Sequence, residues 1–285
     1  MGDAKKIPEL LFPVLIFSTM KAYPRFLTPE LEPFDPLELA KATERTVCQG
    51  DQRKYTEFYA TGVYGGIATG YTCGCCLRCI FCWVGLSREF PESYGRFYSP
   101  KQAFQRLKEA AKGHHVSKAR ISGAEPTLGR EHLIPLLGLM EESPLSLFIL
   151  ETNGILFGAD PAYVKEVSQF QKVHTRISLK AGTPEGFTKR TGAMPDAFVL
   201  PFQAIQSFLG QGASFHVASM SADPRFRYDA ERESLLHRLQ EIDPRLIQHL
   251  EEEVVDPYQT TLLRLRYAGS SAFSEETDDR GRKLR

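Results

Sequence analysis

The stretch Thr72–Trp83 reads TCGCCLRCIFCW and holds five of the six cysteines of the chain. The sixth, Cys48, lies well before it. Thiols packed this densely cannot all pair as disulfides without severe strain. Because soft thiolate ligands on a short loop are typical of iron–sulfur and zinc sites, the sequence predicts a metal centre in this stretch.

The cysteines allow two registers of ligands. In the open register, Cys75, Cys79 and Cys82 form a C-x3-C-x2-C pattern that supplies three ligands. Three thiolates on a four-iron cluster leave one iron free to bind another molecule. An open iron of this kind can take part in chemistry.

The alternative is a closed register with the pattern C-x2-C-x2-C-x2-C, which is similar to the cysteine run of ferredoxins. In that register Cys48 serves as a distant ligand, and the site is an electron-transfer cluster. Half of a zinc site is also present, but no second pair of ligands follows it. The run of the closed register consists of Cys73, Cys76, Cys79 and Cys82.

Size and composition are those of a soluble globular protein. The chain has 285 residues, of which 42% are hydrophobic and 25% charged, and its net charge of zero does not indicate a nucleic-acid partner. The most apolar run, Leu10–Met20, is too short to span a membrane, contains Pro13 and lacks a signal-peptide cleavage site, so we expect it to dock on the core. The crowded thiols favour a reducing, cytoplasmic location.

Short apolar runs alternate with helical patterns from Ile67 onward, which is typical of parallel β/α units. The sequence therefore predicts an α/β fold. We expect strands at Ile67–Thr72, Lys118–Ser122, Leu147–Glu151, Thr175–Leu179 and Phe215–Ser219. We expect helices at Lys101–Lys112, Glu131–Met140, Pro161–Phe170 and Phe198–Leu209.

The chain divides into four parts by composition. Residues 1–63 are rich in proline and mixed charge, which predicts an irregular, extended N-terminal extension. Residues 64–222 hold the β/α pattern of the core, and residues 223–273 return to helical patterns with an acidic run around Glu251–Glu253. Residues 274–285 form a charged tail that we expect to be disordered.

Three motifs follow the predicted strands. SGAEP at 122–126 follows the second strand, TNG at 152–154 ends the third, and SLK at 178–180 ends the fourth. The cysteine stretch follows the first strand in the same way. Because β/α barrels place their chemistry at the carboxyl ends of their strands, these four segments are expected to form one site.

The C-x3-C-x2-C pattern with an aromatic residue, Phe81, before its last cysteine resembles the radical S-adenosylmethionine (radical SAM) superfamily. SGAEP is similar to that family's GGEP element, with Ala124 replacing a glycine, a change that requires a negative φ or mild strain. The resemblance runs from about Tyr64 to Ser219, and the C-x-L-x-C-x-F-C-W form looks like the glycyl-radical-activase-like and uncharacterised single-domain branches. It implies a partial (β/α)6 barrel with an N-terminal arm and a C-terminal helical extension.

The resemblance also implies cofactors and partners. The cofactors would be a 4Fe–4S cluster and S-adenosylmethionine, which is cleaved reductively to a 5′-deoxyadenosyl radical that takes hydrogen from a substrate. The implied partners are an electron donor such as flavodoxin or ferredoxin and an unidentified protein, peptide, RNA or small-molecule substrate, because substrate contacts come from variable loops. Within this class a glycyl-radical activase is the alternative. A non-catalytic iron–sulfur carrier is the alternative from another class, and it would not bind S-adenosylmethionine.

The same resemblance assigns roles at the strand ends. Cys75, Cys79 and Cys82 would ligate the cluster. Gly123 would open the backbone, and the segment with Glu125 would accept the cofactor's ammonium group, for which a carboxylate is suited. The remaining cofactor-binding candidates are Phe81, Asn153, Ser178, Lys180 and His216.

Each of these residues also has a structural interpretation. Glu125 could cap a helix, Asn153 could form a turn, and Lys180 could be an exposed lysine entering a loop. A histidine in a half-buried strand, such as His216, is usually a structural residue. Arg176 alternates with Ser178 and could anchor an anionic substrate or pair with a glutamate.

Overall fold

The computed structural model describes residues 23–273 except 221–222, 224 and 227–228. The apolar run Leu10–Met20 and the charged tail 274–285 lie outside the described residues. One nine-stranded sheet organises the described chain, in the order β1-β2-β3-β5-β6-β7-β8-β9, with β4 paired to β2.

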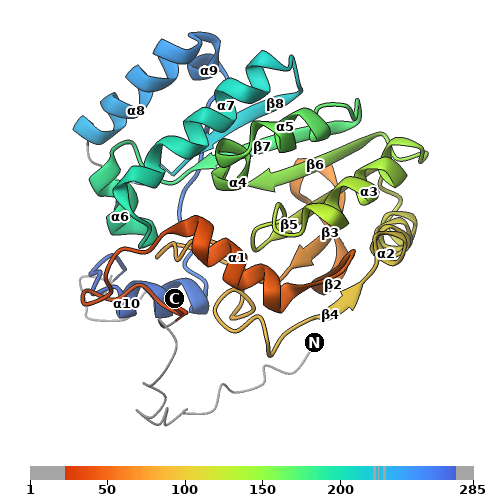
Figure 1. The fold of residues 1–285 in the computed structure, drawn as a ribbon, viewed down its shortest axis with the longest axis horizontal. Helices are drawn as coiled ribbons and strands as arrows, with labels where there is room; N and C mark the ends of the chain where they lie inside the picture. The colour runs from red at the N-terminus through yellow and green to blue at the C-terminus, as the bar shows by residue number, and fades with distance from the viewer. Residues whose placement is uncertain (1–22, 221–222, 224, 227–228, 274–285) are drawn as a thin grey trace, which may run out of the picture.

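Six strands of this sheet are mutually parallel, each beside the next. They are β3 (Ile67–Thr72), β5 (Lys118–Gly123), β6 (Leu147–Thr152), β7 (Val173–Leu179), β8 (Phe215–Ser219) and β9 (Glu251–Glu252). Helices alternate with them, and Figure 1 shows α2, α3, α5 and α7 following one another along one side of the sheet. The α/β class and the partial (β/α)6 barrel predicted from the sequence are confirmed.

Each helix except α9 has buried residues, which pack against the rest of the fold. In α2, the Ser99 side chain accepts from the Gln102 amide, and the Gln102 side chain accepts from the Ser99 amide, which closes the first turn as a capping box. The helices after α1 are α2 (Pro100–Gly113), α3 (Arg130–Glu141), α4 (Ile155–Ala159), α5 (Pro161–Val167), α6 (Pro184–Thr191), α7 (Leu200–Gly210), α8 (Asp229–Ile242), α9 (Arg245–Gln248) and α10 (Gln259–Tyr267), with 3-10 turns at Val63–Gly65 and Pro195–Val199.

The N-terminal part is more regular than the sequence predicts. Residues 36–61 contain helix α1 (Pro36–Val47) and strand β2 (Gln52–Thr61), not an irregular arm. Asp35 caps α1 by accepting from the Leu37 amide at 2.8 Å, and Pro36 occupies the first helical position, where proline is tolerated. β2 pairs antiparallel with β3, β1 (Cys48–Gln49) and β4 (Arg96–Tyr98), so it extends the sheet beyond the barrel strands.

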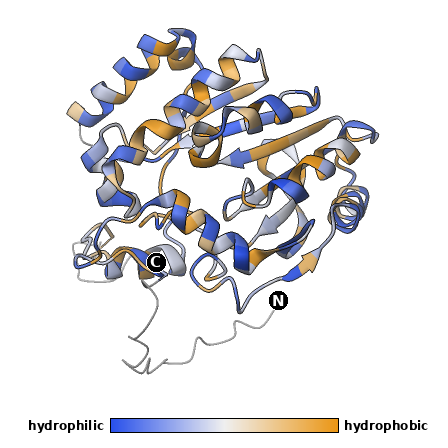
Figure 2. Cartoon of the chain, in the orientation of Figure 1, coloured by the Kyte–Doolittle hydropathy of each residue, from blue (hydrophilic) through white to orange (hydrophobic). Residues whose placement is uncertain are grey.

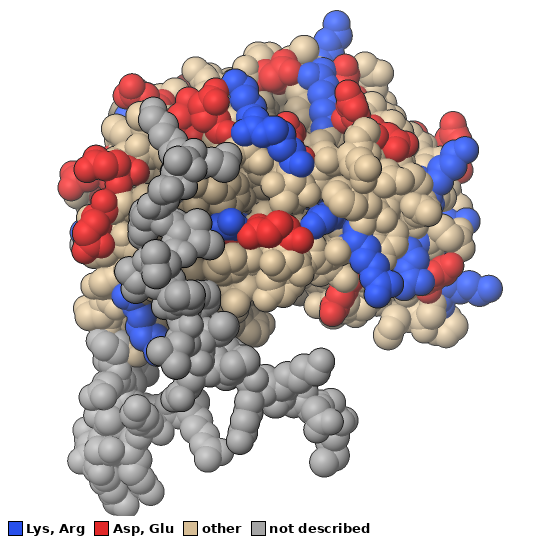
Figure 3. Space-filling model, turned by 60° about the horizontal axis from the view of Figure 1, so that its bottom comes forward, with Lys and Arg blue, Asp and Glu red and all other residues tan. Residues whose placement is uncertain are grey.

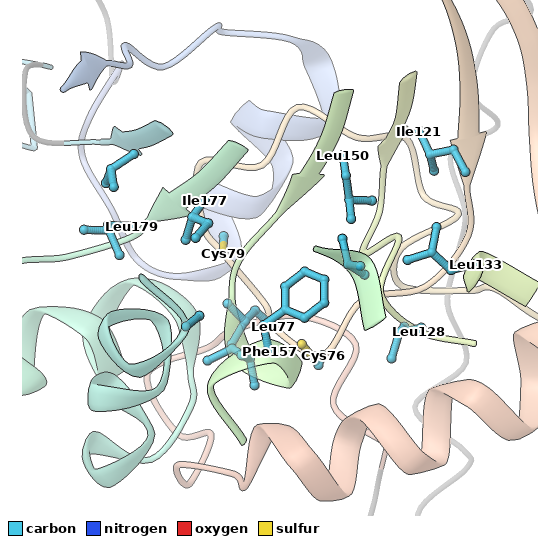
Figure 4. Packing of buried hydrophobic residues seen from close by; sticks show 14 of the residues in the cluster. Cys76, Leu77, Cys79, Ile121, Leu128, Leu133, Leu150, Phe157, Ile177 and Leu179 are labelled. Carbon is cyan, nitrogen blue, oxygen red and sulfur yellow. The ribbon is translucent and has the colours of Figure 1, made fainter. Parts of the chain in front are cut away.

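The core lies between the parallel strands and the helices. β3 is buried along its whole length, as expected for a strand covered on both faces. Figure 2 shows that β6 is hydrophobic along most of its length, whereas α2 and α8 carry many hydrophilic residues. Figure 4 shows Ile121, Leu150, Ile177 and Leu179 of three neighbouring strands in this core.

The C-terminal residues complete the sheet and then cover the cysteine stretch. β9 pairs with β8 at the edge of the sheet. Further on, α10 packs against the chain after Cys82, where the Thr261 hydroxyl donates to the Cys82 carbonyl at 3.2 Å. The described residues of the expected helical extension at 223–273 therefore contain three helices and also a short strand. In the part of the chain that the structure describes, no helix is both long and apolar enough to cross a bilayer.

Candidate functional site

An open cavity of about 710 Å³, a volume that includes the solvent space at its mouth, lies at the carboxyl ends of the barrel strands. The loop after β3 forms one wall, and the turns after β5, β6 and β7 form the others. Nine of the ten predicted site residues line this cavity, His216 being the exception. The nine are Cys75, Cys79, Phe81, Cys82, Gly123, Glu125, Asn153, Ser178 and Lys180.

The two cysteine registers differ in their access to the cavity. Cys73 and Cys76 have no exposed surface and do not line it. Cys73 packs against Gly95, where a Cβ added to the glycine would lie 2.6 Å from the cysteine sulfur. Cys48 likewise packs against Gly129, away from the cavity. The closed register therefore does not share a common space, whereas the open register does.

Cys75 and Cys76 are adjacent in the sequence but differ in their access to the cavity. Cys76 belongs to the hydrophobic core, whereas Cys75 is partly buried and packs against it. A hydrogen bond from Cys76 lowers the pKa of the Cys75 thiol to about 7 and holds the pKa of Cys76 itself well above its usual value. Burial raises the pKa of Cys79 to about 12. Because the pKa of the proposed ligand Cys79 is raised as well, access to the cavity distinguishes the pair: Cys75 lines the cavity and Cys76 does not.

The three cavity thiols fit an iron–sulfur cluster better than a single ion. Among the described residues, no group of three or more His, Cys, Asp or Glu side chains converges closely enough to hold one metal ion. Structural zinc needs four ligands around one point. A four-iron cluster places each thiolate on a different iron, so its ligands stand further apart around a common space.

The turn after β5 requires the glycine at 123. Gly123 has φ +93°, and a Cβ there would lie 3.2 Å from the Thr72 amide nitrogen. This left-handed region favours glycine. Ala124 is not among the non-glycine residues of the described chain with positive φ, so the substitution in the SGAEP motif causes no such strain.

Glu125 is a buried brace between two strand ends, with 2% of its surface exposed. Its Oε1 accepts hydrogen bonds from the Thr127 and Thr152 hydroxyls, both at 2.7 Å, and from the Thr127 amide at 3.1 Å. Its Oε2 accepts from the Asn153 amide at 2.9 Å. The Glu125 amide in turn donates to the Gly74 carbonyl, which ties the turn to the cysteine loop. The carboxylate is thus engaged by the protein itself.

Asn153 combines a structural role with a place in the cavity. Its Oδ1 accepts from the Ile155 amide at 3.0 Å, at the start of α4. Its Nδ2 lies 3.3 Å from the sulfur of Cys76 and 3.7 Å from that of Cys75. Asn153 therefore links the turn after β6 to the cysteine loop.

Lys180 and Ser178 form a polar wall at the end of β7. The Lys180 ammonium donates to the Ser178 hydroxyl at 2.6 Å, and Ser178 donates to Glu253. Burial would raise the pKa of Glu253, but the charges of Lys180 and Arg176 and the Ser178 hydrogen bond hold it below its usual value. A lysine has three donors, so Lys180 can also receive an anionic group in the cavity.

Arg176 pairs with glutamates, one of the two roles that its position in β7 allowed. It donates to both oxygens of Glu251, at 2.9 and 2.8 Å, and lies 3.1 Å from Glu253. His216 bonds Glu251 at 2.8 Å and His174 at 2.7 Å, outside the cavity lining. This placement favours the structural interpretation of His216.

Several polar residues of the cavity carried no recognisable sequence motif. Glu151 lines the cavity, and it accepts hydrogen bonds from Arg120 at 2.7 Å and Tyr64 at 2.8 Å. Glu253 lines it too, and its only sequence signal was the acidic run after residue 250. The part of the cavity beyond the cysteines is therefore lined by paired charges.

Comparison with known proteins gives the family. The model of the radical SAM superfamily matches residues 70–206. SuiB of Streptococcus suis, solved bound to the precursor peptide SuiA, superposes with a TM-score of 0.51 at 18% identity, covering 67% of this chain and 38% of SuiB. TYW1 with a lysine–pyruvate adduct bound superposes with a TM-score of 0.50 at 14% identity, covering 68% of this chain and 66% of TYW1. No curated protein matches the chain.

A further solved structure, anSMEcpe with bound AdoMet, has 18% identity and a TM-score of 0.46, covering 64% of this chain and 47% of that protein. The chain spans less than two fifths of the length of SuiB, and the likeness to SuiB and TYW1 shows a common fold. Radical SAM proteins use a 4Fe–4S cluster and S-adenosylmethionine. The family match spans the cysteine loop and the three strand-end motifs, so residues 70–206 of this chain form a radical SAM domain.

Proposed function

We propose that the cavity binds a 4Fe–4S cluster at Cys75, Cys79 and Cys82, and S-adenosylmethionine beside it. When bound, these cofactors supply reductive cleavage of S-adenosylmethionine to a 5′-deoxyadenosyl radical that takes a hydrogen atom from the substrate. One observation carries the proposal: the three cysteines of the open register share one cavity with the turns after β5, β6 and β7, and the other three cysteines do not line it.

The residues of the strand ends bind and orient the cofactor in this proposal. The positive φ of Gly123 presents the backbone of its turn to the cofactor's ammonium group, and the buried carboxylate of Glu125 holds that turn in place. Lys180 receives the carboxylate of the methionine part, and Ser178 orients Lys180. Phe81, which is 5% exposed and lines the cavity, excludes water from its wall.

The proposal also includes an external electron donor and a cytoplasmic location. The enzyme requires an external electron donor, for which a flavodoxin or a ferredoxin is suited. All six cysteines are free thiols, which supports a reducing, cytoplasmic location. Acidic and basic side chains share the face shown in Figure 3, in line with the zero net charge.

Reconstitution under anaerobic conditions tests the proposal directly. We expect about four irons per chain in one cluster, because the sequence has one cysteine set with cluster spacing. After reduction with dithionite, we expect S-adenosylmethionine to be converted slowly to 5′-deoxyadenosine, measured by chromatography. A full and reducible cluster that produces no deoxyadenosine would favour a non-catalytic carrier instead.

Replacing Lys180 with methionine tests the anion contact. The change keeps the apolar stem and removes the charge, so we expect S-adenosylmethionine to bind roughly ten- to a hundredfold more weakly, from about 1.5–3 kcal/mol for a hydrogen bond to a charged group. Equilibrium dialysis with the reconstituted protein measures this, and iron content should stay near that of the wild type. Lys101→Met, on the exposed side of α2, is the matched control. If Lys180→Met strips the iron, the residue has a structural role.

A further inference from the structure

The backbone carbonyls of the three proposed ligands share one feature: each accepts a hydrogen bond from a buried arginine. We call these three arginines the arginine frame. Its contacts are Arg78 Nη1 to the Cys75 carbonyl at 2.8 Å, Arg88 Nη1 to the Cys79 carbonyl at 2.7 Å, and Arg264 Nη1 to the Cys82 carbonyl at 2.6 Å.

All three guanidinium groups are removed from solvent. Arg78, Arg88 and Arg264 are 0%, 1% and 2% exposed. Glu89, which is also fully buried, is the one carboxylate of the described residues that ion-pairs with the frame, and it bonds Arg88 and Arg264. The frame and Glu89 together therefore carry three positive charges and one negative charge.

Arg78 has no carboxylate partner among the described residues. It donates to the carbonyls of Cys75, Leu77 and Pro24, and its guanidinium lies 4.9 Å from the centre of the Tyr23 ring. Its Nη2 is buried without a hydrogen-bond partner in the described chain. Buried charge is costly unless an opposite charge compensates it, so the excess positive charge favours an anion in the loop that the frame surrounds.

A four-iron cluster held by three thiolates is such an anion, and it gains a further negative charge on reduction. Reduction potentials of iron–sulfur clusters respond to net charge, hydrogen bonding and solvent exposure around them. Fixed positive charges stabilise the reduced state more than the oxidised state, because the reduced state carries more negative charge.

We propose that Arg78, Arg88 and Arg264 are positioning residues that fix the loop at each ligand cysteine and raise the reduction potential of the bound cluster. The proposal rests on the proposed function, since it requires a cluster at Cys75, Cys79 and Cys82. It extends the cluster site to α10, because Arg264 lies 182 positions after Cys82 in the chain.

Charge-changing variants of the Arg264–Glu89 pair test the electrostatic role. Arg264→Met removes one positive charge, and we expect about a tenfold shift of the one-electron equilibrium toward the oxidised cluster, which is about 59 mV. Glu89→Gln removes the negative charge, and we expect a shift of similar size in the opposite direction. In the double variant both charges are gone, so its potential should return close to the wild-type value.

The readout is a redox titration of the reconstituted protein, followed by electron paramagnetic resonance in the absence of S-adenosylmethionine. Arg266→Met is the matched control, because Arg266 is exposed on the same helix. Arg264→Lys keeps the charge and should keep the potential, which provides a measurement if the methionine variant does not fold.

The outcomes separate this proposal from the one on which it rests. A wild-type protein that assembles no cluster at the three cysteines would overturn the proposed function. A normal cluster whose potential is unchanged by Glu89→Gln, or moves in the same direction in Glu89→Gln and Arg264→Met, would overturn the role of the arginine frame alone.

Discussion

Replacing Cys75 with alanine is expected to abolish cluster assembly and S-adenosylmethionine cleavage, whereas Cys76→Ala and Cys73→Ala keep both. Cys75 lines the cavity, while Cys76 and Cys73 are fully buried and do not. Loss of one of three ligands leaves a cluster without enough thiolates to hold it. Iron and sulfide analysis together with the visible absorbance of the cluster measures the outcome.

The controls are built into the same set of variants. Cys76→Ala removes a sulfur next to the ligand and should retain the change in the reduced cluster's electron paramagnetic resonance spectrum when S-adenosylmethionine is added. Cys73→Ala should behave in the same way. If Cys75→Ala retains its cluster and Cys76→Ala loses it, the closed register is correct and the site described here is not the reactive one.

Replacing Glu125 with alanine is expected to give the next largest effect, a combined loss of stability and cofactor binding. The carboxylate accepts from two buried backbone amides, those of Thr127 and Asn153, and from two hydroxyls. At about 1–3 kcal/mol for each buried donor left without a partner, the two amides alone cost about 2–6 kcal/mol. Thermal unfolding of the apoprotein measures this, independently of the cluster.

The isosteric Glu125→Gln variant should fall between the alanine variant and the wild type. The side-chain oxygen of glutamine still accepts hydrogen bonds. Its NH2 group is a donor, however, and it faces another donor that bonded a carboxylate oxygen in the wild type. We expect weaker S-adenosylmethionine binding with iron content near normal. Glu131→Ala, at an exposed position on α3, is the control for loss of a carboxylate. If the unfolding temperature of Glu125→Ala is the same as that of the wild type, Glu125 does not brace the two strand ends.

The barrel strands were predictable because their sequence pattern is local. β3 and β8 have the predicted bounds, and β5, β6 and β7 extend the predictions by one or two residues. Parallel strands covered on both faces read as short apolar runs, which the sequence displays directly. β9 has no such signal: its residues are acidic, and its place at the sheet edge coincides with pairing of Glu251 to Arg176.

The N-terminal helix shows why composition can mislead. Prolines around α1 suggested an irregular chain, but Pro36 begins the helix instead of interrupting it. The buried residues Leu39, Ala40, Thr43 and Val47 follow helical spacing within a charged segment. Such a helix is stabilised by packing against the rest of the fold, and the local sequence pattern does not show that packing.

The site residues also fall into two groups, those that the sequence predicted and those that it did not. The cysteines and the strand-end turns were found because each lies next to a predicted strand in the sequence, and parallel strands bring their ends together. Arg88 and Arg264 were not found, because their contacts with the cysteine loop are to backbone carbonyls, which have no side-chain signature. The internal partners of Glu125 were hidden for a related reason, since two of its donors are backbone amides.

The pairing of Glu89 with Arg264 also has a consequence for how the protein is made. The two residues are 175 positions apart in the chain, so at about 5–20 residues per second the ribosome delivers Arg264 roughly 9–35 s after Glu89. During that interval the cysteines have already been synthesised, but Thr261 and Arg264, which donate to the Cys82 carbonyl in the folded protein, have not. Iron delivery before that point of translation would therefore meet an unfinished loop, and we expect cluster insertion to follow synthesis and docking of α10.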